Sequence, residues 1–143
     1  MIYMEQNIAI KLNKDNIDKI NYDEIIAVTI AEGWAMGEPN AFYAVLNNLE
    51  RYYVNLGDSD ITKEQFFKAF PVMEKFNCLW EEVLYLDKGW SWFNMGCGNY
   101  LLVREKYKDK IYNYIKGNFG DDWHHGELYQ KWYEALKNII NTK

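Results

Sequence analysis

Cysteine and proline are scarce in this sequence of 143 residues. Each occurs twice, and the two cysteines, Cys78 and Cys97, form no CxxC pair. Secreted domains that depend on disulfide bonds usually carry more cysteine, so we expect the protein to work in a reducing compartment, the cytoplasm. A chain of this length buries about 70% of its unfolded surface and needs neither disulfides nor a structural metal. We expect residues 1–143 to form one globular domain.

Long apolar segments are also missing. No run of about 18 apolar residues, the length of a membrane-spanning helix, occurs in the chain. The first residues, Met1–Asn7, lack the basic and apolar regions of a signal peptide. We therefore expect no membrane span and no membrane partner.

The motifs of the large enzyme classes are absent as well. The sequence contains no P-loop, no HExxH, no GxSxG and no EF-hand loop. Its nearest approach to a dinucleotide fingerprint is Gly96-Cys97-Gly98, where Leu101 stands in place of the third glycine. These absences argue against an enzyme, and we expect no catalytic residue.

Basic residues are too few for a typical nucleic-acid-binding protein. The net charge is −5: residues 1–103 carry 15 acidic and 8 basic side chains, a balance of −7, whereas residues 104–143 carry 6 and 8, a balance of +2. Because phosphates attract basic proteins, we expect no nucleic acid partner. An acidic body favours a partner protein with a basic surface, or serves solubility alone.

Aromatic residues, by contrast, are abundant. The chain has 12 tyrosines, 7 phenylalanines and 6 tryptophans, 17% of all residues. Aromatic side chains enlarge a hydrophobic core, and tyrosine and tryptophan also anchor interfaces. The composition leaves open whether these side chains lie in the core or on the surface.

Apolar segments with strand-like patterns predict an antiparallel sheet. Residues 25–31 are apolar and β-branched on both faces, which indicates a central strand. Asn47-Asn48 and Gly96–Asn99 predict hairpin turns, and residues 83–86 are expected to pair with residues 90–95. The segments with strand patterns are 8–12, 25–31, 42–46, 51–56, 83–86, 90–95 and 100–104.

The clearest helix signal is a capping box. Thr62 and Gln65 have the spacing of that motif, and the helix they begin must end near Phe70, because Pro71 cannot continue it. Residues 72–82 leave helix and strand both open.

Two further segments predict C-terminal helices. Apolar residues keep helical spacing over 103–115, with Gly117 expected just after the helix, and again over 128–140. Asp121 and Asp122 are candidate N-caps of the last helix. The elements together predict an α+β fold: an antiparallel, mostly meandering sheet with one inserted short helix and two C-terminal helices.

The loop after the central strand is the first candidate binding site. Glu32 and Glu38 lie six residues apart on a glycine-containing loop, and this spacing does not define the distance between their carboxylates that acid–base catalysis would require. An aromatic residue and a methionine between acidic edges are typical of a recognition surface, with core filling by the tryptophan as an equal alternative. The residues concerned are Glu32, Trp34, Met36 and Glu38.

Trp90, Trp92 and Asn99 are the remaining candidate binding residues. The two tryptophans, two apart in a strand, should share one sheet face, with Phe93 on the other. A sheet face left uncovered by helices would form an aromatic platform, to which these tyrosines could contribute: Tyr52, Tyr53, Tyr85 and Tyr100. Sheets that stack bases are basic, whereas this chain is acidic, so a core role is favoured. For Gly96–Asn99, a plain turn is favoured over a phosphate nest.

Both histidines lie in Asp121–Glu127, the best candidate for metal binding. On a helix, however, the adjacent residues His124 and His125 diverge by about 100°, and metal ligands on one face need a spacing of three or four. Acidic residues at a helix start account for the segment without a metal. We expect no metal ion and no cofactor.

These observations leave three hypotheses about function. The first is a non-catalytic, acidic protein-binding module, such as an immunity-type or phage-type inhibitor of a basic partner. The second is a domain that binds a small ligand, a nucleotide or a sugar, on its aromatic side chains. The third is a hydrolase of unfamiliar type that uses Glu32, Glu38 or the two histidines. A concave aromatic pocket with a few converging polar groups would favour the second hypothesis, and a flat or ridged acidic face with exposed aromatics the first.

Overall fold

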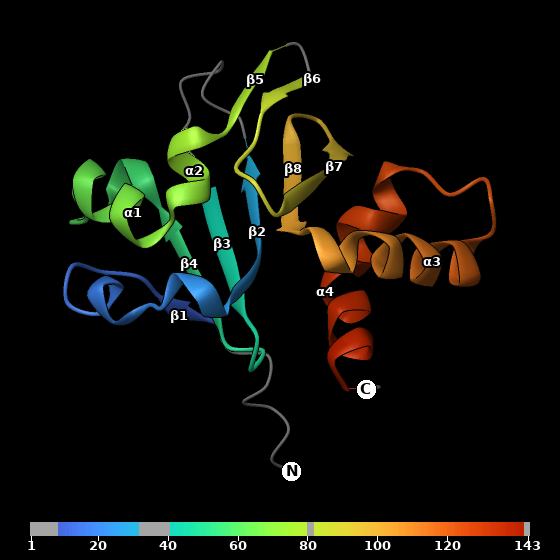
Figure 1. The fold of residues 1–143 in the computed structure, drawn as a ribbon, viewed down its shortest axis with the longest axis horizontal. Helices are drawn as coiled ribbons and strands as arrows, with labels where there is room; N and C mark the ends of the chain where they lie inside the picture. Colours follow the sequence, from blue (N-terminus) through green and yellow to red (C-terminus); the bar gives the residue numbers. More distant parts are fainter. Residues whose placement is uncertain (1–8, 32–40, 80–81, 142–143) are drawn as a thin grey trace.

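A six-stranded sheet forms the centre of the fold (Figure 1). The computed structural model describes residues 9–31, 41–79 and 82–141. The strand order is β1-β4-β3-β2-β8-β7, and all neighbours are antiparallel except β1 and β4, which run parallel. The strands are β1 (Ile10–Lys11), β2 (Ile25–Ala31), β3 (Ala41–Leu46), β4 (Arg51–Asn55), β7 (Trp90–Gly96) and β8 (Asn99–Arg104). The predicted α+β class, with a mostly antiparallel sheet, is confirmed.

The central strand β2 is apolar on both faces because helices cover both sides of the sheet around it. Val28 packs in the cluster on one face and Ala27 in the cluster on the other, and both side chains are fully buried. This two-sided burial explains why residues 25–31 show no polar alternation. The predicted bounds of this strand are confirmed.

One face of the sheet is covered by three short helices. They are α1 (Lys63–Ala69) and α2 (Pro71–Lys75), from the middle of the chain, and the 3-10 helix η2 (Ile17–Lys19), from its first part. The predicted capping box is confirmed: the amide of Gln65 donates to the Thr62 hydroxyl at 3.0 Å, and the amide of Thr62 donates to the Gln65 side chain at 3.1 Å. The remaining 3-10 turns are η3 (Tyr22–Glu24), η5 (Leu56–Asp58) and η6 (Glu105–Tyr107).

Two longer helices pack on the opposite face, α3 (Lys108–Phe119) and α4 (His125–Asn141). Both were predicted, but two details of their ends were wrong. Gly117 lies inside α3, which continues to Phe119 and ends at Gly120, whose φ of 81° only glycine adopts readily. Asp121 and Asp122 do not cap α4, because that helix begins at His125.

The predicted pairing of residues 83–86 with 90–95 is also wrong. The strand β6 (Glu82–Tyr85) pairs instead with β5 (Asn77–Leu79), in a separate two-stranded sheet (Figure 1). The strand β7 pairs with β8 on one side, and on its other side the Lys108 ammonium donates to the carbonyl of Trp92 at 2.6 Å. A side chain therefore occupies the edge that β6 would have used.

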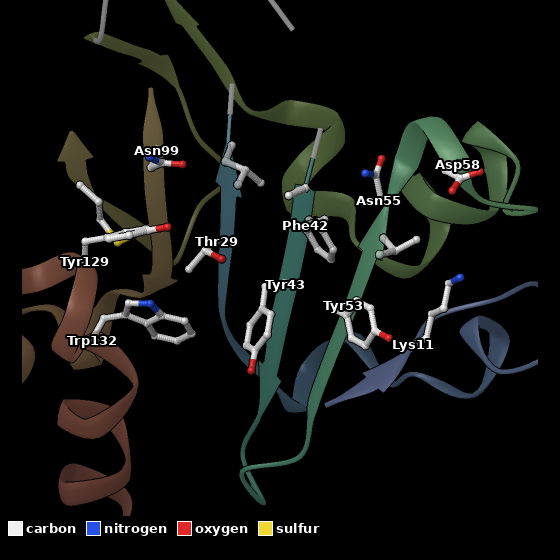
Figure 2. Close-up of a pocket in the computed structure, with 14 residues that line it drawn as sticks. Lys11, Thr29, Phe42, Tyr43, Tyr53, Asn55, Asp58, Asn99, Tyr129 and Trp132 are labelled. Atoms are coloured by element: carbon white, nitrogen blue, oxygen red, sulfur yellow. The ribbon is translucent and has the colours of Figure 1, made fainter. Parts of the chain in front are cut away.

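The helices α3 and α4 cover only part of their sheet face. Their buried contacts are with β7, β8, β2 and one residue of β3, Val45. Beyond α4, no helix of the described residues covers the same face of β3, β4 and β1, and this face carries a groove, whose lining side chains are drawn in Figure 2. Within the described part of the chain, no helix has the length and apolar character needed to cross a membrane.

Candidate functional site

The groove beside α4 is the candidate site because, of the hollows among the described residues, it carries the most aromatic and polar side chains. Its volume is about 370 Å³, within the usual range of small-molecule sites, which begins at about 300 Å³. The lining residues come from all six strands of the main sheet, from η5 and from α4. We use the term groove for this set: Lys11, Thr29, Ile30, Ala41, Phe42, Tyr43, Tyr53, Val54, Asn55, Asp58, Met95, Asn99, Tyr129 and Trp132.

Strand register builds the floor of the groove. Thr29 is the direct partner of Tyr43, Tyr43 is the partner of Tyr53, and Tyr53 is the partner of Lys11. Residues directly opposite each other in neighbouring strands point to the same face. The four side chains therefore form one row across β2, β3, β4 and β1, as Figure 2 shows.

The wall of the groove comes from α4. Trp132 and Tyr129 reach from this helix toward the row on the sheet (Figure 2). The rings of Trp132 and Tyr43 meet edge to face, with centroids 5.9 Å apart and planes at 85°. Tyr129 is 55% exposed and Tyr53 is 41% exposed, so two aromatic side chains are accessible on opposite sides of the groove.

Uncharged polar side chains lie beside the aromatic residues of the groove. The Asn55 side chain accepts the amide hydrogen of Gly57 at 3.2 Å, and the Asn99 side chain donates to the carbonyl of Gly96 at 3.0 Å. These bonds hold the two carboxamides in place. Burial raises the pKa of Tyr43, an effect that the charge of Arg51 partly opposes, so its hydroxyl is neutral and able to donate at physiological pH.

Charged side chains are sparse in the groove. Its described lining residues include one cation, Lys11, and one carboxylate, Asp58, and no histidine or cysteine. A pair of carboxylates or a nucleophile with its base is therefore not assembled among them. This arrangement suits binding by contact and hydrogen bonding.

Asn99 is the sequence-predicted binding residue that the structure places in the groove. Glu32, Trp34, Met36 and Glu38 lie outside the described residues.

Trp90 lies in the core. It is 6% exposed, and its indole nitrogen donates to the hydroxyl of Tyr22 at 2.9 Å. The guanidinium of Arg104 lies 4.3 Å from the Trp90 ring and donates to the backbone carbonyl of Tyr22 at 2.7 Å. This arrangement ties β7 and β8 to η3 at the end of the sheet.

Trp92 lies on the same face as Trp90, and Phe93 lies on the other, as predicted. The Trp92 ring is half-buried, with its centroid 6.3 Å from that of Tyr100. Trp90 and Trp92 thus face away from the groove.

The two histidines have structural contacts at the start of α4. The ring nitrogen Nδ1 of His124 accepts the amide hydrogen of Gly126 at 3.1 Å, and the Glu127 carboxylate accepts the amide hydrogen of His124 at 3.0 Å. His125 packs against Gly96, where an added Cβ would lie 3.2 Å from the Cβ of His125. Across the described ranges, no three histidine, cysteine or acidic side chains gather as metal ligands.

Five aromatic residues of the groove were not among the candidate binding residues from the sequence: Phe42, Tyr43, Tyr53, Tyr129 and Trp132. The alternation of side chains along a strand places Tyr53 and the buried Val54 on opposite faces of the sheet. This alternation is the sequence signal that could have identified Tyr53 as a surface residue. Of the tyrosines expected on a platform, Tyr53 alone lines the groove. Tyr52 and Tyr100 belong to the other face, and Tyr85 lies in the small sheet.

A search against models of protein families, curated proteins and solved structures found no match.

Proposed function

We propose that this protein is a non-catalytic binding domain whose groove holds a small ring-shaped ligand of the sugar or nucleotide class. The observation that carries the proposal is the row of Thr29, Tyr43 and Tyr53 on the sheet facing Trp132 and Tyr129 on α4. Aromatic side chains offer large, rigid contact surfaces at low entropic cost, and a few fixed polar groups give orientation. Both kinds of group meet in this groove.

We further propose that the protein works in a reducing compartment such as the cytoplasm. Support comes from Cys97, whose thiol is free and exposed. Exposed thiols of this kind persist where thiols are kept reduced.

A nuclear magnetic resonance titration tests the proposed binding. The probes are methyl β-glucopyranoside and adenosine, each added at millimolar concentrations to the 15N-labelled chain, since fragments of this size bind with dissociation constants of about 1 mM. We expect at least one probe to shift the backbone amides of Thr29, Tyr43 and Asn55 and the indole signal of Trp132.

Two single substitutions of exposed tyrosines provide the comparison. Tyr129→Ala removes part of the groove wall, whereas Tyr112→Ala removes a tyrosine of α3 that is 43% exposed and does not line the groove. Tyr129→Ala should bind about tenfold more weakly and so give much smaller shifts at the same ligand concentration, and Tyr112→Ala should give the wild-type shifts. If neither probe shifts groove signals, or if the shifts of Tyr129→Ala equal those of the wild type, the proposal is wrong.

Protein binding is the second candidate function, and the small sheet favours it. Leu84 and Tyr85 of β6 are each 53% exposed, and exposed apolar side chains of this size are typical of interface anchors. Combined with the balance of −7 over residues 1–103, they support a basic partner protein, as for an inhibitor of the immunity or phage type.

This candidate predicts a salt-sensitive partner. A basic protein recovered from native extract at low salt should be lost at high salt and with the Tyr85→Ala variant, and retained with Tyr112→Ala. Recovery that is equal for both variants would contradict a role for β6.

A further inference from the structure

We infer that the ligand of the groove is a neutral oligosaccharide. The inference rests on the proposed function, because it specifies the chemistry of the ligand at the same site. It depends on four features of the described lining residues: the charge balance, the fixed neutral polar groups, the exposed aromatic surfaces, and the length of the row of side chains on the sheet.

The charge balance argues against a phosphorylated ligand. Proteins hold phosphate with clustered arginine and lysine side chains, with the amino end of a helix or with a nest of backbone amides. The groove has one lysine, Lys11, and one carboxylate, Asp58, so its charged side chains cancel. In a chain with a net charge of −5, nothing among these lining residues offsets the charge of a nucleotide.

The polar groups of the groove match sugar hydroxyls. A hydroxyl both donates and accepts a hydrogen bond, as do carboxamides and other hydroxyls. The side chains of this kind in the groove are Thr29, Tyr43, Tyr53, Asn55, Asn99 and Tyr129. Asn55 and Asn99 are already oriented by their bonds to Gly57 and Gly96, which lowers the entropy that binding must remove.

The aromatic surfaces match the apolar faces of pyranose rings. A pyranose ring carries hydroxyls around its rim and C–H groups on its faces, so its faces can stack on tyrosine or tryptophan while the rim forms hydrogen bonds. Tyr53 and Tyr129 are 41% and 55% exposed, so each has surface left for such a contact.

The length of the row favours several rings over one. The row from Thr29 to Lys11 crosses three strand spacings, about 14 Å at 4.7–4.9 Å each. This distance exceeds the width of a single pyranose ring. A short chain of sugars lying across β2, β3 and β4 would contact both exposed tyrosines.

A glycan array tests the inference with the intact chain. The array carries neutral oligosaccharides and sulfated, phosphorylated and sialylated ones, and nucleotides are immobilised beside them. The proteins compared are the wild type, two groove variants, Tyr53→Ala and Tyr129→Ala, and two matched variants of exposed tyrosines elsewhere, Tyr85→Ala and Tyr112→Ala.

We expect the wild type to bind neutral oligosaccharides, and each groove variant to bind about tenfold more weakly, as the loss of one stacking contact implies. Tyr85→Ala and Tyr112→Ala should bind as the wild type does. Circular dichroism spectra confirm that each variant is folded. Adding salt should leave the binding of a neutral ligand nearly unchanged.

The other outcomes separate the two claims. If charged glycans or nucleotides bind and the groove variants lose them, the neutral oligosaccharide is wrong and the proposed binding groove stands. If the binding of every immobilised compound is unaffected by Tyr53→Ala and Tyr129→Ala, while the binding of a protein partner is lost, the groove is a peptide-binding surface and the saccharide inference is wrong. If neither the binding of an immobilised compound nor the binding of a protein partner is weakened in these two variants, the proposed function is wrong as well.

Discussion

At the scale of single residues, His124 acts as the N-cap of α4. Its Nδ1 atom accepts from the amide of Gly126, its own amide donates to the Glu127 carboxylate, and its Nε2 atom lies 2.8 Å from the same carboxylate. This pattern resembles a capping box, with histidine in place of serine or threonine and with the amide of Gly126, at position N2, in place of the N3 amide. The cap accounts for a histidine and a glutamate at the start of α4 without a metal ion.

Replacing His124 should therefore destabilise the protein by the usual cost of a lost cap. We expect His124→Ala to lower the free energy of unfolding by about 1 kcal/mol, and His124→Ser to recover most of it. Asp122→Ala is the control, because Asp122 is one of the two N-caps predicted from the sequence and is exposed. Urea denaturation measures all three. A larger loss in Asp122→Ala than in His124→Ala would contradict the assignment.

Tyr22 connects several residues at the end of the sheet. Its hydroxyl accepts from Trp90 at 2.9 Å and donates to the Asp87 carboxylate at 3.3 Å. Burial raises the pKa of Tyr22, whereas the Trp90 bond and the Arg104 charge act in the opposite direction. The neutral phenol is thus the form that the folded state prefers.

This preference predicts a loss of stability at alkaline pH. Because the folded pKa is raised, the contribution is complete below the unfolded value of about 10 and disappears as pH rises through the folded pKa. Tyr22→Phe should cost about 1 kcal/mol at pH 7, for the lost hydrogen bonds, yet show a shallower decline above pH 10 than the wild type. Denaturation at a series of pH values measures both slopes, and equal slopes would contradict the prediction.

At the scale of elements, Lys108 protects the open edge of β7. Its ammonium donates to the Trp92 carbonyl at 2.6 Å and lies 4.9 Å from the Phe93 ring centroid. Burial lowers the pKa of this ammonium, while the nearby Asp109 acts against the shift. Unpaired strand edges can pair with another chain, and lysine is a common means of preventing that.

Removal of this lysine should therefore promote association. We expect Lys108→Ala to form dimers or larger species at concentrations where the wild type does not, and to lose about 1–2 kcal/mol of stability with its charged hydrogen bond. Lys110→Ala, a change at an exposed lysine of the same helix, is the control. Light scattering after gel filtration measures the masses. Equal masses for both variants would show that Lys108 does not protect the edge.

Elements with strong local signals could be predicted from sequence, whereas their long-range pairing could not. The Thr62–Gln65 capping box and the apolar strand over residues 25–31 depend on neighbouring residues alone, and both are confirmed. The partner of β6 depends on which strand edges are occupied elsewhere, here by Lys108. Likewise, Gly117 and Gly120 both fit the C-cap of α3 by sequence alone. In the structure Gly117 is helical and Gly120 is the C-cap, a choice that the local sequence does not determine.

At the scale of the whole molecule, the groove exists because α3 and α4 cover only part of a six-stranded sheet. Its floor and wall combine residues as distant in sequence as Lys11 and Trp132. Strand alternation predicts which residues share a face, but the coverage of each face is a tertiary property. For this reason Tyr43 and Trp132 could not be identified as groove residues from the sequence. Asn99 was a candidate only because of the turn at Gly96–Asn99.

The most direct test of sugar binding is the position of a bound sugar relative to the groove aromatics. The measurement is a set of intermolecular nuclear Overhauser effects between the wild-type protein and the neutral oligosaccharide that binds most tightly on the array. We predict contacts from the sugar C–H protons to the ring protons of Tyr53, Tyr129 and Trp132. Contacts only to residues of the small sheet, such as Leu84 and Tyr85, or the absence of any neutral oligosaccharide that binds, would contradict a saccharide-binding groove.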